Sequence, residues 1–162
     1  LRFFRFHAAY GHGAPDRDGV KACIAGRAGL AQLSRERVRM ELLKLLLAKY
    51  ATAALATMSE AGLLQQVLGG VADLAAFDRM TMIEQAQHRS PDPVRRLGAL
   101  AVRIPEDAER LQQRLRLSNA EFERLRSMGE SWWRISPASE RDARVQLYRI
   151  GPERYLDRVL MA

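Results

Sequence analysis

The chain has few of the residues that cross-link small proteins or bind metals. Among its 162 residues there is one cysteine, Cys23, and there are three histidines, His7, His12 and His88. One cysteine cannot form an internal disulfide, and these four residues do not have the spacing of a zinc site. We therefore predict no metal site, and we interpret Cys23 as a small buried residue.

The sequence also lacks the run of about 18 apolar residues that a membrane span requires. Its longest apolar stretch, Leu42 to Ala48, is interrupted by Lys44 and followed by Lys49. The first residues, Leu-Arg-Phe-Phe-Arg-Phe, do not form a signal peptide. We predict a cytoplasmic protein with no membrane partner, and we expect a piece of a longer protein, because the chain opens without Met inside an apolar and basic helical pattern.

No segment shows the period-two alternation and β-branched richness of a strand, so we predict an all-α fold, a bundle or short solenoid of helices. Residues 38–47 place Val38, Leu42, Leu45 and Leu46 on one helical stripe, with Ser34 at the N-cap position. Gly62 and Gly69 are expected to end the next two helices, and residues 71–89 keep a helical period.

The second half contains clear helix starts and stops. Pro105 with acids in the following turn predicts one start, and the Ser118 to Glu121 capping box with Gly129 predicts a complete helix. Ser136-Pro137 and Gly151-Pro152 predict two more starts. Ser-Pro-Asp-Pro at residues 90–93 breaks the pattern and is a possible seam between two helical subdomains.

Nearly all of the positive charge is arginine. The net charge is +7 and the pI about 10.3, yet the chain has only three lysines, at positions 21, 44 and 49. Guanidinium groups suit bidentate binding of phosphate and stacking on bases, which favours a nucleic-acid partner. An arginine-rich composition also arises from genomic base composition, and charge alone leaves that alternative open.

Two stretches carry a family resemblance. Residues 1–11, Leu-Arg-Phe-Phe-Arg-Phe-His-Ala-Ala-Tyr-Gly, resemble the run that follows the nucleotide-selecting Glu-Asp-x-x-Arg motif of class II tRNA nucleotidyltransferases, with Arg2 and Arg5 at its two arginines. Residues 33–47, Leu-Ser-Arg-Glu-Arg-Val-Arg-Met-Glu-Leu-Leu-Lys-Leu-Leu-Leu, are similar to that family's Leu-Ser-x-Glu-Arg-x-x-x-Glu-x-x-Lys-Leu-Leu motif. The similarity continues through residues 53–55 and 60–64, and in the last 90 or so residues only 115–119 resemble the family.

The resemblance implies the neck, body and tail of a CCA-adding tRNA nucleotidyltransferase or bacterial poly(A) polymerase, without its catalytic head. We expect the end of the neck in residues 1–33, a neck and body domain with the family motif in 34–89, and body and tail helices in 90–162. The implied function is tRNA binding for an enzyme that adds or repairs the 3′ CCA. The alternatives are a poly(A) polymerase and a free-standing helical protein-interaction module.

The same resemblance sets the expected ligands. The parent enzyme would use Mg²⁺ with ATP and CTP, whereas this chain would hold no cofactor, have no catalytic residue and be inactive alone. The expected partners are tRNA or another RNA 3′ end and the catalytic head in cis. The oligomeric state stays open.

The resemblance places neck support and nucleotide binding on Arg2, Arg5, Arg37 and Glu41. Arg2 would lie near the triphosphate of the incoming nucleotide, and Arg5 would support it or face RNA. Arg37 and Glu41 are four residues apart, so we predict an ion pair that braces the neck; an ordinary exposed ion pair is the alternative.

We predict RNA contacts, mainly to phosphates, at Arg35, Arg39, Arg103, Arg110 and Arg114. Many arginines have acids three or four residues away, so a mixed solvated face is the alternative. Trp132 and Trp133 are interpreted as core, with base stacking as the alternative. Glu106-Asp107-Ala-Glu-Arg110 spells the nucleotide-template pattern, but its position after Pro105 favours simple helix capping.

Overall fold

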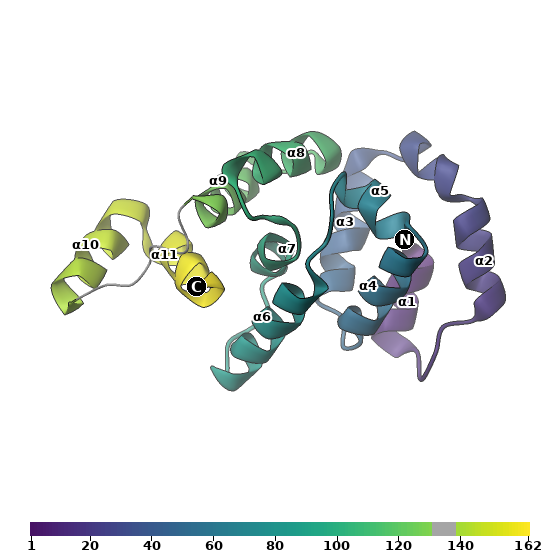
Figure 1. Cartoon of the computed structure of the whole chain (residues 1–162), viewed down its shortest axis with the longest axis horizontal. Coiled ribbons are helices and arrows are strands. Elements are labelled where there is room, and N and C mark those ends of the chain that lie inside the picture. The colour runs from purple at the N-terminus through teal and green to yellow at the C-terminus, as the bar shows by residue number, and fades with distance from the viewer. Residues whose placement is uncertain (131–138) are drawn as a thin grey trace.

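The computed structural model describes residues 1–130 and 139–162, and every regular element in them is a helix (Figure 1). This confirms the all-α prediction. The body is elongated, with α1–α5 at one end and α10 and α11 at the other. None of the described helices is long and apolar enough to cross a membrane. In chain order the elements are α1 (Arg2–Tyr10), α2 (Arg17–Ala25), the 3₁₀ helix η1 (Arg27–Gln32), α3 (Arg35–Leu46), α4 (Ala51–Glu60), α5 (Leu63–Leu68), α6 (Leu74–Ala86), α7 (Pro93–Ala101), α8 (Pro105–Leu115), α9 (Asn119–Gly129), α10 (Glu140–Ile150) and α11 (Pro152–Met161).

The helix ends follow the local signals in the sequence. The Ser34 hydroxyl accepts a hydrogen bond from the backbone N–H of Arg37, and Ser118 and Glu121 form the expected capping box. Gly62 and Gly69 both have positive φ and separate α4, α5 and the following turn. The helix expected over 71–89 is shorter, because the Asp73 carboxylate accepts from the Ala76 N–H and starts α6 at residue 74.

Helix α7 lies at the centre of the core. All its residues from Val94 to Ala101 are buried, and it packs against α3, α6 and α9. The turn at residues 90–93 therefore connects two helices that pack against each other, α6 and α7. The buried apolar residues form one cluster that runs from α1 to α9, so the core continues across the possible seam.

A cluster of buried charges ties α6, α7, α9 and α11 together. Asp157 of α11 accepts hydrogen bonds from Arg95 and Arg124, in each case from Nε at 2.8 Å. Glu84 of α6 accepts from Arg95 at 3.0 Å and from Arg96 at 2.8 Å, and Asp92 accepts from Arg124 at 3.1 Å. Three guanidiniums thus face three carboxylates, which offsets the cost of burying each charge. We call these six residues the buried ion cluster.

The segment from α2 through η1 packs more lightly than the rest of the chain. It contributes no fully buried residue, although Val20, Cys23 and Leu30 touch the core. Cys23 is thus half-buried, and the prediction that it is buried was wrong, because α2 covers the edge of the core and not its centre. The predictions for Trp132, Trp133 and Ser136-Pro137 lie outside the described residues.

Candidate nucleic-acid interface

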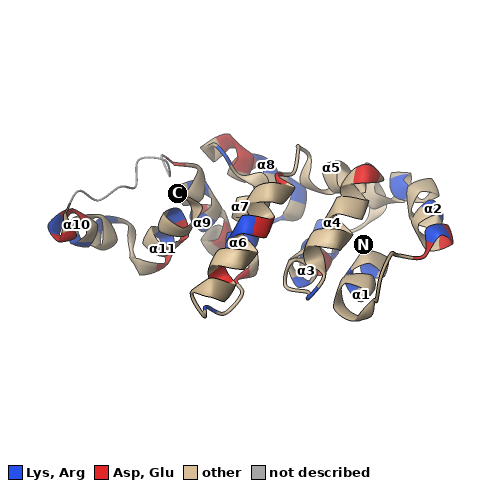
Figure 2. Cartoon of the chain, turned by 60° about the horizontal axis from the view of Figure 1, so that its bottom comes forward, with Lys and Arg blue, Asp and Glu red and all other residues tan. Residues whose placement is uncertain are grey.

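Positive charge is unevenly distributed along the chain. Residues 1–70, the N-terminal region, hold ten of the 26 basic residues but only five of the 19 acids. Residues 71–162, the C-terminal region, hold the other 16 basic residues and 14 acids. In Figure 2, segments coloured for basic and for acidic residues lie close together on the ribbons of α10 and α11. The N-terminal region therefore carries most of the excess charge available to a polyanion.

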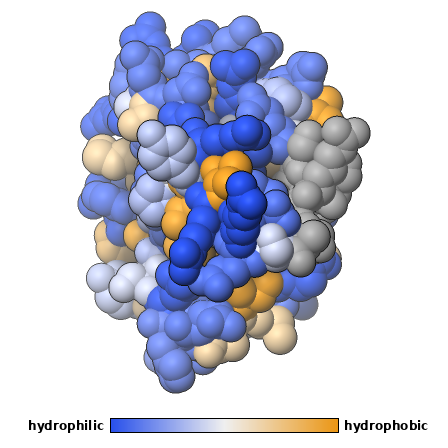
Figure 3. Space-filling model, turned by 90° about the vertical axis from the view of Figure 1, so that its left-hand side faces the viewer, coloured by the Kyte–Doolittle hydropathy of each residue, from blue (hydrophilic) through white to orange (hydrophobic). Residues whose placement is uncertain are grey.

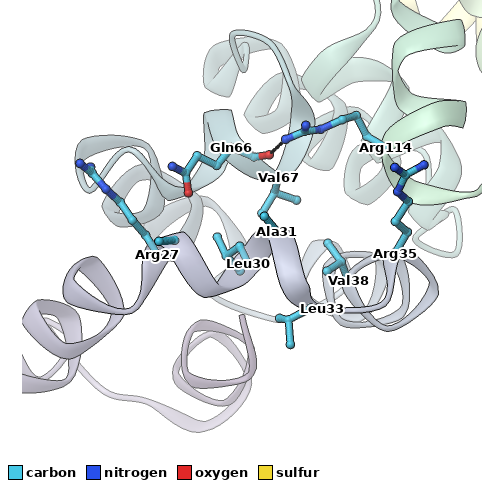
Figure 4. Close-up of a pocket in the computed structure, with 10 residues that line it drawn as sticks. Arg27, Leu30, Ala31, Leu33, Arg35, Val38, Gln66, Val67 and Arg114 are labelled. Atoms are coloured by element: carbon cyan, nitrogen blue, oxygen red, sulfur yellow. Dashed lines mark hydrogen bonds between the residues drawn. The ribbon is translucent and has the colours of Figure 1, made fainter.

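A groove lined mainly by the N-terminal region gathers three arginines, Arg27 and Arg35 from that region and Arg114 from α8 of the C-terminal region. It lies between η1, the start of α3, α5 and α8, and it has a volume of about 430 Å³. Figure 4 shows Arg35 and Arg114 at one end of it, Arg27 at the other, and apolar side chains between them. None of the described residues that line it carries a carboxylate. The lining residues are Arg27, Ala28, Leu30, Ala31, Leu33, Arg35, Val38, Gln66, Val67 and Arg114.

The fold positions two of these arginines through backbone contacts. Arg114 extends from α8 across the end of α5 and donates to the carbonyl of Gln66. Gly69 permits this path, because a Cβ there would lie 3.2 Å from the Arg114 side chain and the backbone has φ +71°. Arg35 donates to the carbonyl of Gln113 at 2.9 Å. Each guanidinium has five N–H donors, so both retain donors for a phosphate.

The groove arginines make no ion pair with any described residue. Within residues 1–130 and 139–162, the ion pairs of the structure involve neither Arg27, Arg35 nor Arg114. All three are exposed. Their charge is thus not neutralised by the part of the chain that the structure describes, and the groove is positively charged.

The other predicted RNA-binding arginines have structural partners. Arg39 pairs with Glu121 at 2.9 Å and donates to the carbonyl of Arg116, which joins α3 to α9. Arg103 pairs with Asp73, and Arg110 pairs with Asp107. Both also donate to backbone carbonyls. The structure brings Arg35 and Arg114 together at the groove and gives these three arginines bracing contacts instead.

The predicted pair of Arg37 with Glu41 does not form. Glu41 accepts from Arg5 of α1 at 2.7 Å, and Arg37 has no ion pair with any described residue. The partner is different because α1 packs against α3 and brings the Arg5 guanidinium to Glu41. Arg5 also lies over the Phe6 ring at 4.4 Å, as Arg2 does at 5.3 Å. Glu41 does brace two helices, but with a different arginine.

The second Glu-Asp-x-x-Arg pattern is a helix start. Asp107 accepts from the backbone N–H groups of Arg103 and Ile104, at 2.7 and 3.2 Å. Burial raises the pKa of Asp107, but these hydrogen bonds and Arg110 outweigh it and hold the pKa below its usual range. The capping interpretation is confirmed. Among the described residues no three acidic, histidine or cysteine side chains gather as a metal site would require.

Sequence reasoning missed Arg27, and one signal would have found it. Arg27 has no acid three or four residues away on either side, and the same holds for Arg35 and Arg114. Arg39, Arg103 and Arg110 all have such an acid, and all three form ion pairs in the fold. Among these six arginines, the local absence of acids distinguishes the groove arginines from the paired ones, but it does not hold for Arg5, which has no such acid and pairs with Glu41 of α3.

Most of the N-terminal region matches a known protein family. Residues 16–74 match the family model described as "Probable RNA and SrmB- binding site of polymerase A", and they include Arg27 and Arg35. Over 123 residues, or 75% of the chain, the sequence is 35% identical to CCA tRNA nucleotidyltransferase 1, mitochondrial, of Danio rerio. The match covers 28% of that relative, so the chain spans less than a third of its length.

Proposed function

We propose that this chain, which belongs to the family of CCA-adding tRNA nucleotidyltransferases and poly(A) polymerases, binds RNA for such an enzyme. The proposed substrate of the parent is a tRNA whose 3′ CCA is added or repaired. The observation that carries this proposal is the groove with three unneutralised guanidiniums and no carboxylate.

The three arginines of the groove suit binding to the phosphates of an RNA backbone. Planar guanidiniums bind phosphate oxygens through paired N–H donors, and such contacts position RNA without reading its sequence. Recognition by shape and phosphates is typical of proteins that hold structured RNA. The groove would therefore hold the RNA while another part of the parent enzyme acts on its 3′ end.

The proposed chemistry lies outside this chain. We propose that a catalytic head elsewhere in the parent enzyme holds Mg²⁺ with ATP and CTP. Addition of a poly(A) tail is the second candidate activity, favoured by the wording of the family model. The relative is mitochondrial by name, and a cytoplasmic location stays a prediction for this chain.

Fluorescence anisotropy with a tRNA lacking its 3′ CCA tests the proposal, in a salt series from about 50 to 200 mM. The informative variant is Arg27→Gln with Arg35→Gln, and the matched control is Arg141→Gln with Arg149→Gln, two exposed arginines of α10. Both variants lose two charges. We expect only the groove variant to bind more weakly and to have a shallower salt dependence, by roughly one unit in slope for each phosphate that is no longer bound.

The control variant separates the groove from general charge. Equal weakening of both variants would mean nonspecific attraction, and no RNA binding at low salt would favour a helical protein-interaction module instead. On the face shown in Figure 3, at the α10 and α11 end, apolar residues form small patches between hydrophilic ones, apart from what grey atoms cover.

A further inference from the structure

A second cavity opens beside the groove. It has a volume of about 200 Å³ and lies between α1, the end of α2, η1 and the start of α5. Arg27 and Leu30 line both the groove and this cavity, so the two adjoin at these residues. The lining residues are Leu1, Phe4, Cys23, Gly26, Arg27, Leu30, Met58 and Leu63.

The two walls of this cavity differ in packing. Phe4, Met58 and Leu63 are 4% exposed or less and belong to the central core, so they form a fixed apolar floor. The opposite wall comes from α2 and η1, which contribute no fully buried residue. A lightly packed wall over a fixed floor can adjust to a flat ligand at low cost.

Arg27 is the one charged side chain among the described residues that line the cavity. It stands where the apolar cavity meets the positively charged groove, and its guanidinium lies 3.6 Å from the position that a Cβ on Gly62 would occupy. A ligand that suits this arrangement has a flat apolar part for the cavity and an anionic part for Arg27. A nucleotide of single-stranded RNA has both.

We propose that this cavity receives one unstacked nucleobase of a single-stranded RNA segment whose phosphate is bound by Arg27. The inference rests on the proposed function and deepens it, because it names single-stranded RNA as the ligand of the groove. Bases of a duplex are stacked and paired, so their faces cannot enter the cavity. A duplex would reach the groove arginines only through its phosphates.

The reactivity of Cys23 reports on whether the cavity is occupied, because Cys23 lines the cavity and is the single cysteine of the chain. The experiment measures the rate at which N-ethylmaleimide alkylates Cys23, alone and with a short single-stranded RNA or an RNA duplex. At an RNA concentration ten times the dissociation constant we expect single-stranded RNA to slow alkylation about ten-fold. The duplex, at the same multiple of its own constant, should leave the rate nearly unchanged.

A substitution at the same residue gives a second readout. Cys23→Phe fills the cavity from its lightly packed wall, and Ile24→Phe places the same ring on the next residue of α2, outside the lining. We expect Cys23→Phe to weaken binding of single-stranded RNA and to leave duplex binding unchanged, while Ile24→Phe changes neither. Circular dichroism checks that both variants fold.

The outcomes separate the two proposals. Binding of single-stranded RNA without protection of Cys23, or with equal protection by the duplex, would overturn the base pocket and leave the groove in place. Absence of binding to any RNA at low salt would overturn both. Equal weakening by Cys23→Phe and Ile24→Phe would assign the effect to α2 as a whole and reject the pocket.

Discussion

The N-terminal and C-terminal regions use the same side chain, arginine, in opposite ways. In the N-terminal region the groove arginines Arg27 and Arg35 are exposed and have no acidic partner in the described chain. In the C-terminal region Arg95, Arg96 and Arg124 are buried and face Glu84, Asp92 and Asp157. Charge balance therefore indicates where arginine is free to bind a ligand and where it holds helices together.

The expected cost of removing a charge also differs between exposed and buried arginines. An exposed ion pair contributes at most about 1 kcal/mol, whereas removing one partner of a buried pair costs about 3–5 kcal/mol because a charge stays buried without compensation. Arginine substitutions in the groove should thus change binding with little effect on stability. Substitutions in the buried ion cluster should do the reverse.

The largest expected effect comes from removing the shared acid of the buried ion cluster. Asp157→Asn leaves Arg95 and Arg124 without their common carboxylate and should lower the free energy of unfolding by about 3–5 kcal/mol. Urea denaturation followed by circular dichroism measures it. The control is Glu153→Gln, which removes an exposed partner of Arg124 and should cost less than about 1 kcal/mol. Similar costs for both would contradict a structural role of the cluster.

A smaller effect should come from adding one methyl group to α7. Gly98→Ala places a Cβ against Sδ of Met128 and 3.4 Å from Leu125, so the Met128 side chain or α9 must shift, at a cost of about 1–3 kcal/mol. The same change at Gly29 in η1 meets nothing within 4 Å and should be close to neutral. Thermal unfolding of the two variants measures packing in the two regions directly. A destabilising Gly29→Ala would show that η1 packs more tightly than its exposure indicates.

Low pH should lower the stability of the C-terminal region, because its paired carboxylates become protonated. Burial raises the pKa of Asp92, but the Arg95 N–H and Arg124 outweigh burial and hold the pKa below its usual range. The pKa of Asp73 is lowered in the same way, by the Ala76 N–H and Arg103. A carboxylate with a lowered native pKa contributes stability above its unfolded pKa, about 3.9, and loses it as the pH falls through the native value.

The free energy of unfolding should therefore fall as the pH drops below about 4, and Asp92→Asn should flatten part of that fall. Asparagine also caps helices, so this variant keeps the start of α7 while removing the charge. Denaturation in urea from pH 5 to about pH 3 measures both proteins. A pH profile that Asp92→Asn leaves unchanged would mean that this carboxylate does not contribute.

The smallest effect concerns Glu41, where sequence and structure disagree. A double-mutant cycle of Arg5→Ala and Glu41→Ala should give a coupling energy of about 0.5 kcal/mol, because both side chains are partly exposed. The cycle of Arg37→Ala with Glu41→Ala should give nearly zero. The reverse ranking of the two cycles would restore the i, i+4 pair and remove the ion pair between α1 and α3.

Local signals in the sequence were sufficient to predict the fold class and most helix ends. Ser34, Gly62, Ser118 and Pro105 act through neighbours within four residues, so the sequence alone reveals their roles. The buried ion cluster was not predictable in this way, because Arg95 and Asp157 are 62 positions apart. The groove was partly predictable: Arg35 and Arg114 were predicted as RNA contacts, but their proximity depends on how α8 crosses α5.

One side chain, Arg96, joins the two regions. Its Nε binds Glu84 of the buried ion cluster, and its Nη1 donates at 2.7 Å to the carbonyl of Leu46, the last residue of α3. That carbonyl has no partner within its own helix, so α3 depends on α7 for it. Neither region can lose its structure without exposing a polar group in the other. The groove and the buried ion cluster should consequently unfold as one cooperative unit, with a single calorimetric transition.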